Sequence, residues 1–363
     1  MAQLDALFKE LKSTGGSDLH LVVGELPKMR IHGSIVNVEG YDIFTLESMK
    51  LWLTEILRPD QLDAYMNDKD LDFAYALEGV ARFRCNYFNQ KDGYAAVFRI
   101  IPEKIKTIAE LNLPPVLSTL SDYERGLVLV TGPTGSGKST TLAAVINEIN
   151  DKTSKHIVTI EDPVEFVHVP KKAVITHREV GQHCTSFDSG LRAAVREDPD
   201  VILVGEMRDL ETIRLALTAA EMGFLVLGTL HTNSAVKTID RIVDVFPASQ
   251  QSAVRGMLAG SLAAIVSQLL IKAADGKGRC CANEILFSSP ALSNAVREGN
   301  LNMIRSIIQA GGSRGMQLMD DAIEKLVASG KADPRDAFMK GTEKTRFQKY
   351  LTDIPAGVGV EGH

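Results

Sequence analysis

Apolar and polar positions along the first hundred residues follow two different periods. Leu4, Leu7, Phe8 and Leu11 recur at helical spacing and predict an amphipathic helix at the start of the chain. Short apolar or alternating runs separated by Gly, Pro and Asp then predict several strands and two further helices. The predicted strands are 18–23, 28–32, 71–77, 80–88 and 94–101, and the predicted helices are 46–57 and 59–66. This mixture predicts an α+β domain of about a hundred residues, an ordinary domain size.

The rest of the chain has a different pattern, in which short, fully apolar runs alternate with helical segments. The runs are 127–130, 157–160, 201–204 and 225–230, and the helical segments between them include 139–149 and 210–222. Runs of this kind are typical of buried parallel strands, so we expect an α/β domain with a mostly parallel sheet and helices on both faces. The region from about Arg255 onward, including 318–327, is expected to be mainly helical.

Prolines mark the change between the two patterns. Pro102, Pro114 and Pro115 disfavour one continuous helix and suit a connection. The expected domains are therefore 1–101 and 116–363, joined by a linker at 102–115. A length of 363 residues agrees with two domains.

Composition and charge narrow the class of protein. No apolar run is long enough to cross a bilayer, and the first residues lack the layout of a signal peptide, so we expect a cytoplasmic location. A net charge of −6 argues against a broad nucleic-acid surface, and no nucleic-acid partner is expected.

The most informative motif follows the apolar run 127–130. Residues 132–139 read Gly-Pro-Thr-Gly-Ser-Gly-Lys-Ser and lead directly into a helical segment. Glycines in this position let backbone N–H groups close around phosphates, Lys138 reaches the outer phosphates, and the Ser139 hydroxyl is suited to Mg²⁺. The strand, loop and helix in this order predict a nucleoside triphosphate site.

Acidic residues follow two of the other predicted strands. Glu161 and Glu165 come at or after the end of the run 157–160, and Glu206 comes just after the run 201–204. Ligands of open parallel sheets gather at the carboxyl ends of the strands, so these acids are expected to face the phosphates. His231, after the run 225–230, is a candidate contact to the terminal phosphate.

Together these segments resemble a known superfamily. Five segments are similar to the Walker A, Asp box, Walker B and His box motifs of secretion-type ATPases, namely 132–139, 159–165, 196–200, 205–209 and 228–232. Within that superfamily, the chain most resembles the type IV pilus retraction ATPases, over nearly its whole length.

The resemblance implies a fold, a mechanism and roles for individual residues. Members are hexamers of a PAS-like N-terminal domain joined to a RecA-like P-loop ATPase domain, with the nucleotide between the two. By position, Glu165 with Glu161 would orient or deprotonate the attacking water, Glu206 would support the metal, and His231 would sense the terminal phosphate. The arginines expected to act as fingers are Arg82, Arg84 and Arg99, with Arg241 a weaker candidate.

The cofactors implied are ATP and Mg²⁺, with Ser139 and Glu206 as metal ligands. The expected nucleotide-binding residues are Gly132, Pro133, Thr134, Gly135, Ser136, Gly137, Lys138, Ser139 and Thr140.

The resemblance also implies partners and a location. The expected partners are further copies of the chain in a homo-hexamer and an inner-membrane pilus platform protein, which places the chain at the inner face of the cytoplasmic membrane. Whether a paralogous retraction ATPase shares the work is left open.

One motif departs from the family. The retraction ATPases typically carry Ala-Ile-Arg-Asn-Leu-Ile-Arg-Glu, whereas residues 291–298 read Ala-Leu-Ser-Asn-Ala-Val-Arg-Glu. We expect neither the tetracysteine module nor the long additional N-terminal domain common in extension and secretion relatives, which favours retraction. The alternatives are a pilus-extension or type II secretion assembly ATPase and, from other classes, a nucleotide-controlled scaffold or a DNA translocase.

Overall fold

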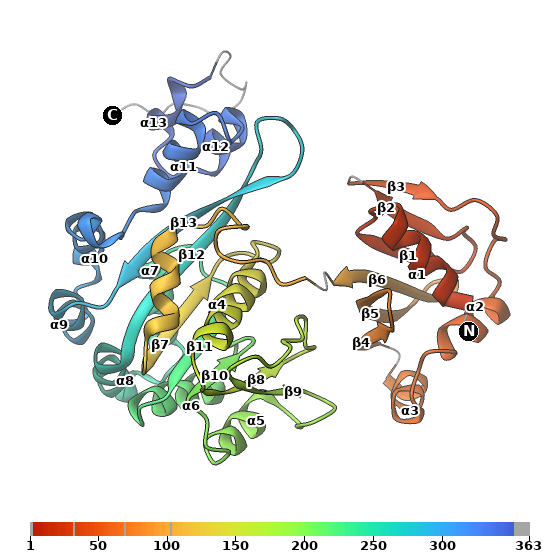
Figure 1. The fold of residues 1–363 in the computed structure, drawn as a ribbon, viewed down its shortest axis with the longest axis horizontal. Helices are drawn as coiled ribbons and strands as arrows, with labels where there is room; N and C mark the ends of the chain where they lie inside the picture. Colours follow the sequence, from red (N-terminus) through yellow and green to blue (C-terminus); the bar gives the residue numbers. More distant parts are fainter. Residues whose placement is uncertain (1–2, 32, 69, 102–103, 352–363) are drawn as a thin grey trace. The chain divides into compact units, whose positions relative to one another are not determined.

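The computed structural model describes residues 3–31, 33–68, 70–101 and 104–351 (Figure 1). The chain forms two compact units, Met1–Ile105 with Asp162–Val167, and Lys106–Glu161 with His168–His363. We refer to them as the first and second units. The sequence placed Asp162–Val167 with the ATPase domain, whereas this segment groups with the first unit. Residues 32 and 102–103, which belong to an expected strand and to the expected linker, lie outside the described part.

The first unit is rich in strands. Its helices are α1 (Gln3–Ser13), α2 (Leu46–Thr54) and α3 (Pro59–Asp68), and its strands are β1 (Asp18–Val22), β2 (Lys28–Ile31), β3 (Ser34–Asn37), β4 (Leu71–Leu77), β5 (Ala81–Gln90) and β6 (Gly93–Ile101). The strands form one antiparallel sheet in the order β3-β2-β1-β6-β5-β4. The expected α+β character of this part of the chain is confirmed.

The apolar face of α1 packs on this sheet. Leu4, Leu7 and Leu11 are completely buried. The ring of Phe8 stacks on Phe83 of β5 with centroids 4.1 Å apart and contacts Phe98 of β6 edge-on at 5.1 Å. Successive side chains of a strand point to opposite faces of the sheet. Phe83 and Phe98 point into the core, so the arginines at positions 82, 84 and 99 lie on the opposite face.

The second unit contains the phosphate loop and is built around a larger sheet. Its strands are β7 (Gly126–Thr131), β8 (His156–Glu161), β9 (Val174–Glu179), β10 (Val201–Val204), β11 (Leu225–Leu230), β12 (Leu262–Lys272) and β13 (Arg279–Phe287). The helices are α4 (Lys138–Lys152), α5 (Phe187–Ala194), α6 (Leu210–Glu221), α7 (Ala235–Asp244), α8 (Ala248–Ser261), α9 (Pro290–Glu298), α10 (Ile304–Ala310), α11 (Met319–Ala328), α12 (Pro334–Lys340) and α13 (Lys344–Gln348), with short 3₁₀ segments η1 (Pro115–Asp122), η2 (Leu301–Met303) and η3 (Gly312–Arg314).

The strand order is β13-β12-β7-β11-β10-β8-β9, and every neighbouring pair is parallel except β12 with β13. The connection β7-α4-β8 runs in one direction across the sheet and β10-α6-β11 runs in the other. Right-handed crossovers therefore place α4 and α6 on opposite faces. Helix α6 packs against α5 and α8, and α4 packs against η1, so the expected two-sided cover is confirmed. None of the described helices is both long and apolar enough to cross a membrane.

Four strands were not predicted. β3 is exposed along its whole length, so it carries no alternating burial pattern. β9 mixes half-buried polar and apolar residues, and the expectation of a mainly helical region after residue 255 is wrong for β12 and β13. β12 carries the buried polar residues Ser267 and Gln268 in the middle of an otherwise apolar run, which hides the strand pattern. Helices do dominate after β13, and α11–α13 gather near one end of the β12–β13 pair (Figure 1).

Candidate functional site

The phosphate loop joins β7 to α4, as the sequence predicts. Gly137 is the residue before the helix and has a left-handed backbone with φ of 89°. Gly132 has φ of 148°, and a Cβ atom there would lie 2.4 Å from the backbone oxygen of Gln268. Only glycine fits this position, because a side chain would collide with the backbone of β12. The first turn of α4 directs its free N–H groups toward the loop, which is the geometry that binds anions.

Lys138 is folded into the loop. Its side chain is largely buried, and Nζ donates to the backbone oxygens of Gly132 at 3.0 Å and Pro133 at 3.2 Å. The ammonium is therefore already held among the loop residues that would surround a phosphate. Ser139 is exposed in the first turn of α4, with Thr140 next to it.

The sheet order brings the predicted site residues of the second unit together. The loop follows β7, His231 follows β11, Glu206 lies just beyond β10, and Glu161 ends β8. These four strands are consecutive neighbours in the order β7-β11-β10-β8 and are parallel. Their carboxyl ends form one edge, so the loop, a histidine and two acids lie in a row along it.

Glu206 and His231 contact each other across this row. Oε1 of Glu206 lies 2.7 Å from Nε2 of His231 and 2.5 Å from Nε of Arg208. Burial opposes ionisation of Glu206, but its contacts with Arg208 and then His231 outweigh burial and lower its pKa. Glu206 is therefore a carboxylate at neutral pH.

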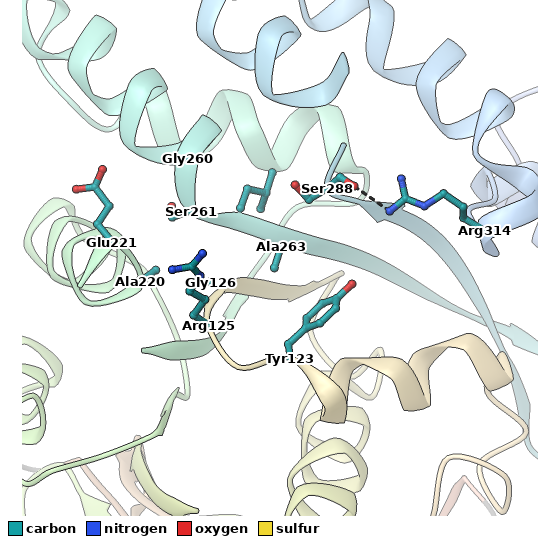
Figure 2. Close-up of a pocket in the computed structure, with 11 residues that line it drawn as sticks. Tyr123, Arg125, Gly126, Ala220, Glu221, Gly260, Ser261, Ala263, Ser288 and Arg314 are labelled. Carbon is teal, nitrogen blue, oxygen red and sulfur yellow. Dashed lines mark hydrogen bonds between the residues drawn. The ribbon is translucent and has the colours of Figure 1, made fainter. Parts of the chain in front are cut away.

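A cavity of about 750 Å³ opens beside these groups, lined among others by Pro133, Thr134, Glu206, His231 and Arg241. Arg241, a weaker candidate from sequence, thus lies at the same cavity as the loop. A separate cavity has a volume of about 840 Å³ and is lined by Tyr123, Arg125, Arg314 and the start of β7 at Gly126 (Figure 2). Gly126 begins the strand whose other end carries the phosphate loop, so this second cavity is not the phosphate site.

Glu161 lies near His177, whose ring stacks on that of His168. Nε2 of His177 accepts from the backbone N–H of His168 at 3.1 Å, so a neutral His177 ring carries its hydrogen on Nδ1. That Nδ1 lies 2.9 Å from Oγ1 of Thr159 and 4.0 Å from Oε1 of Glu161. Burial, followed by the neighbouring His177, lowers the pKa of His168 to about 3, which keeps His168 uncharged.

Glu165 lies in the segment that belongs to the first unit, together with the three candidate arginines. Nη1 of Arg84 is 3.7 Å from Oε1 of Glu165, and Nη2 of Arg82 donates to the backbone oxygen of Val164 at 3.1 Å. Arg99 is directly opposite Arg84 on the neighbouring strand, and its Nε donates to Oδ1 of Asp18 at 2.8 Å. The structure therefore groups Arg82, Arg84 and Arg99 on one sheet face, with Glu165 contacting Arg84.

The nucleotide site contains oxygen atoms of the kind that Mg²⁺ prefers as ligands. Mg²⁺ prefers oxygen ligands and commonly shares them with phosphates. The Ser139 hydroxyl is exposed at the start of α4, and Glu206 is ionised, so both residues fit the metal-binding role given to them. Sequence reasoning did not single out Arg208, His177 or Gln268. The partners of His177 and Gln268 come from other segments of the chain, whose proximity cannot be read from local pattern. Arg208 is only two residues from its partner Glu206, but its contact depends on side-chain direction.

Known proteins resemble this chain in sequence and in fold. The family described as "Type II/IV secretion system protein" matches residues 69–333. The type IV pilus retractation ATPase PilT of Pseudomonas aeruginosa is 51% identical over 335 residues, covering 92% of this chain and 96% of that protein. The twitching motility protein of Neisseria gonorrhoeae is 50% identical over 311 residues, covering 86% of this chain and 83% of that protein. A crystal structure of the pilus retraction motor PilT with bound ADP matches with a TM-score of 0.87 at 42% identity, covering 95% of this chain and 98% of that chain. The chain therefore belongs to the family of type IV pilus retraction ATPases, within the type II/IV secretion system proteins.

Proposed function

We propose that this chain is a motor ATPase that hydrolyses ATP to disassemble type IV pili, and so drives retraction and twitching motility. The observation that carries the proposal is the row of strand ends in the second unit. There the phosphate loop, His231 and Glu206 follow three consecutive parallel strands, and Glu161 ends the next one. Membership of a family of pilus retraction ATPases supports the same conclusion.

In the proposed reaction, residues 132–140 bind the nucleotide. Lys138 exchanges its contacts with the loop carbonyls for oxygens of the outer phosphates, and the N–H groups at the start of α4 bind the others. Mg²⁺, held by Ser139 and supported by Glu206, would supply positive charge to the phosphates. His231, which contacts Glu206, is proposed to respond to the terminal phosphate.

The attacking water is assigned to the Asp box carboxylates. Glu165, with Glu161, orients a water molecule and accepts its proton as the oxygen bonds to the terminal phosphorus and the bond to ADP breaks. The products are ADP and inorganic phosphate. Arg82, Arg84 and Arg99 are proposed as the fingers that stabilise the charge on the transferred group, because a guanidinium has fixed charge and forked donors.

The assembly and location are part of the proposal. We propose a homo-hexamer that acts at the cytoplasmic face of the inner membrane on a pilus platform protein, with a paralogous ATPase as a further candidate partner. Hydrolysis in successive subunits would then reset the first unit in each and produce displacement of the membrane partner.

Deletion of the gene tests the direction of the motor. Cells without the protein are expected to carry surplus pili and to lose twitching motility, and the parent gene should restore both. A gene encoding Lys138→Ala should restore neither. Bald cells after deletion would instead indicate an extension ATPase, and unchanged pili and motility would contradict a role in pilus dynamics.

A further inference from the structure

Gln268 is a buried polar residue beside the phosphate loop. It lies on β12, next to β7, and only 1% of its surface is exposed. In the ladder between these strands Ser267 pairs with Thr131, the last residue of β7. Gln268 therefore comes one position beyond the end of β7, level with the start of the loop.

From this position Gln268 contacts the loop at several points. Its side-chain Nε2 donates to the backbone oxygen of Ser136 at 3.1 Å. Its backbone oxygen lies only 2.4 Å from where a Cβ on Gly132 would be, and its Nε2 lies 3.7 Å from where a Cβ on Gly137 would be. Gln268 thus packs closely against Gly132 and Gly137, the first and last glycines of the loop, and donates a hydrogen bond to Ser136.

Two polar atoms at this contact are buried without a hydrogen-bond partner in the described part of the chain. They are Oε1 of Gln268 and Oγ of Ser136. Buried polar atoms almost always have a partner, so an exception calls for an explanation, such as strain or a functional role. The side-chain amide of Gln268 therefore has an unused acceptor oxygen next to a loop that must close around phosphates.

We propose that Gln268 is a positioning residue that orders the phosphate loop before nucleotide binds. This inference rests on the proposed nucleotide site. A loop with several glycines loses much conformational freedom when it is fixed. A hydrogen bond from a rigid, buried strand removes part of that freedom in advance, so the ligand binds more tightly to a loop that is already in place.

The inference predicts that Gln268 affects nucleotide affinity more than turnover. Once the phosphates are bound, the loop is held by many N–H groups and by Lys138, so the contribution of Gln268 to the chemical step is small. Loss of its bond leaves the buried Ser136 oxygen without this donor, which should weaken binding about fivefold to twentyfold.

The matched substitutions are Gln268→Met and Gln251→Met, made in the full chain. Methionine keeps the shape of glutamine but removes its polar atoms. Nε2 of Gln251 likewise donates to a backbone oxygen, that of Phe246 at 3.2 Å, but from α8. Binding of a fluorescent ADP analogue, steady-state kinetics of ATP hydrolysis and amide hydrogen exchange of residues 132–138 without nucleotide are measured for each.

For Gln268→Met we expect weaker ADP binding, a raised KM, a kcat close to the parent value and faster exchange in the loop. Gln251→Met should match the parent in all four. Gln268→Glu, which cannot donate to Ser136 and adds negative charge, should bind ADP more weakly still, and it tests the inference if the methionine variant does not fold. A folded variant with parental affinity and loop exchange would overturn the role of Gln268, whereas a parent protein that binds no nucleotide would contradict the proposed function itself.

Discussion

Glu206 and His231 contact each other at 2.7 Å, from Oε1 to Nε2, although they are 25 positions apart in the chain. They meet because β10 and β11 are parallel neighbours and both residues lie just beyond the strand ends. The contact joins the proposed metal-supporting acid to the proposed phosphate sensor. A change at the terminal phosphate would therefore affect both side chains together.

The lowered pKa of Glu206 makes its contribution to stability depend on pH. A carboxyl whose pKa falls on folding stabilises the protein above its ordinary pKa, near 4.5 for glutamate, and this contribution is lost as the pH falls through the lowered value. We expect Glu206→Gln to lower the melting temperature at pH 7 and to have a smaller effect at pH 3, below the ordinary pKa. Glu221→Gln, at an exposed acid in α6, is the control and should have little effect at either pH. An equal loss for Glu206→Gln at both pH values would contradict the ion-pair account.

Gly132 is predicted to be the most sensitive glycine of the loop. A Cβ there would lie 2.4 Å from the Gln268 oxygen and 2.6 Å from Oγ of Ser136, in addition to the positive φ. Gly132→Ala should therefore destabilise the protein by about 2–4 kcal/mol and abolish nucleotide binding. Gly256→Ala, in α8 with open space around it, should leave stability unchanged or slightly raised. The free energies of unfolding of the two variants are measured by chemical denaturation. Equal values would show that the loop is not tightly packed on β12.

The candidate arginine fingers have a matched control on the same sheet face. Arg30 of β2 pairs with Asp18, which pairs with Arg99, which pairs with Arg84, so these residues form one row across the first-unit sheet. Arg84→Ala or Arg99→Ala should reduce kcat by up to about 10³-fold if the arginine stabilises the transferred phosphoryl group. Arg30→Ala removes a cation from the same row and should leave kcat near the parent value. Parental turnover in Arg82→Ala, Arg84→Ala and Arg99→Ala alike would exclude these residues as fingers.

The local pattern of the sequence was sufficient for most elements of both units. Leu4, Leu7, Phe8 and Leu11 predicted α1 because a helix with one buried face leaves that spacing in the sequence. The runs before Gly132, Glu206 and His231 predicted buried strands for the same kind of reason. Strands without a regular pattern were missed, as β12 was, because Ser267 and Gln268 are polar and yet completely or almost completely buried.

The candidate site was predicted in its residues but not in its contacts. Motif spacing selected Lys138, Glu206 and His231, yet only the strand order shows which of them are neighbours. Arg208 as a partner of Glu206 and Gln268 as a partner of Ser136 depend on contacts between distant segments or on side-chain direction. The grouping of Glu165 with Arg84 in the first unit also depends on such contacts.

Magnesium-dependent release of phosphate from ATP by the purified full chain tests the central claim most directly. It should be measured for the parent, Lys138→Ala, Glu161→Gln and Glu165→Gln, with nucleotide binding measured in parallel. We predict continuous release by the parent, neither binding nor release by Lys138→Ala, and normal binding with release at least about 100-fold slower for Glu165→Gln. The rate of phosphate release by Glu161→Gln, compared with that by Glu165→Gln, shows which of the two carboxylates contributes more to hydrolysis. No release by the parent, or release at the parent rate by both glutamine variants, would contradict hydrolysis by acids at the strand ends.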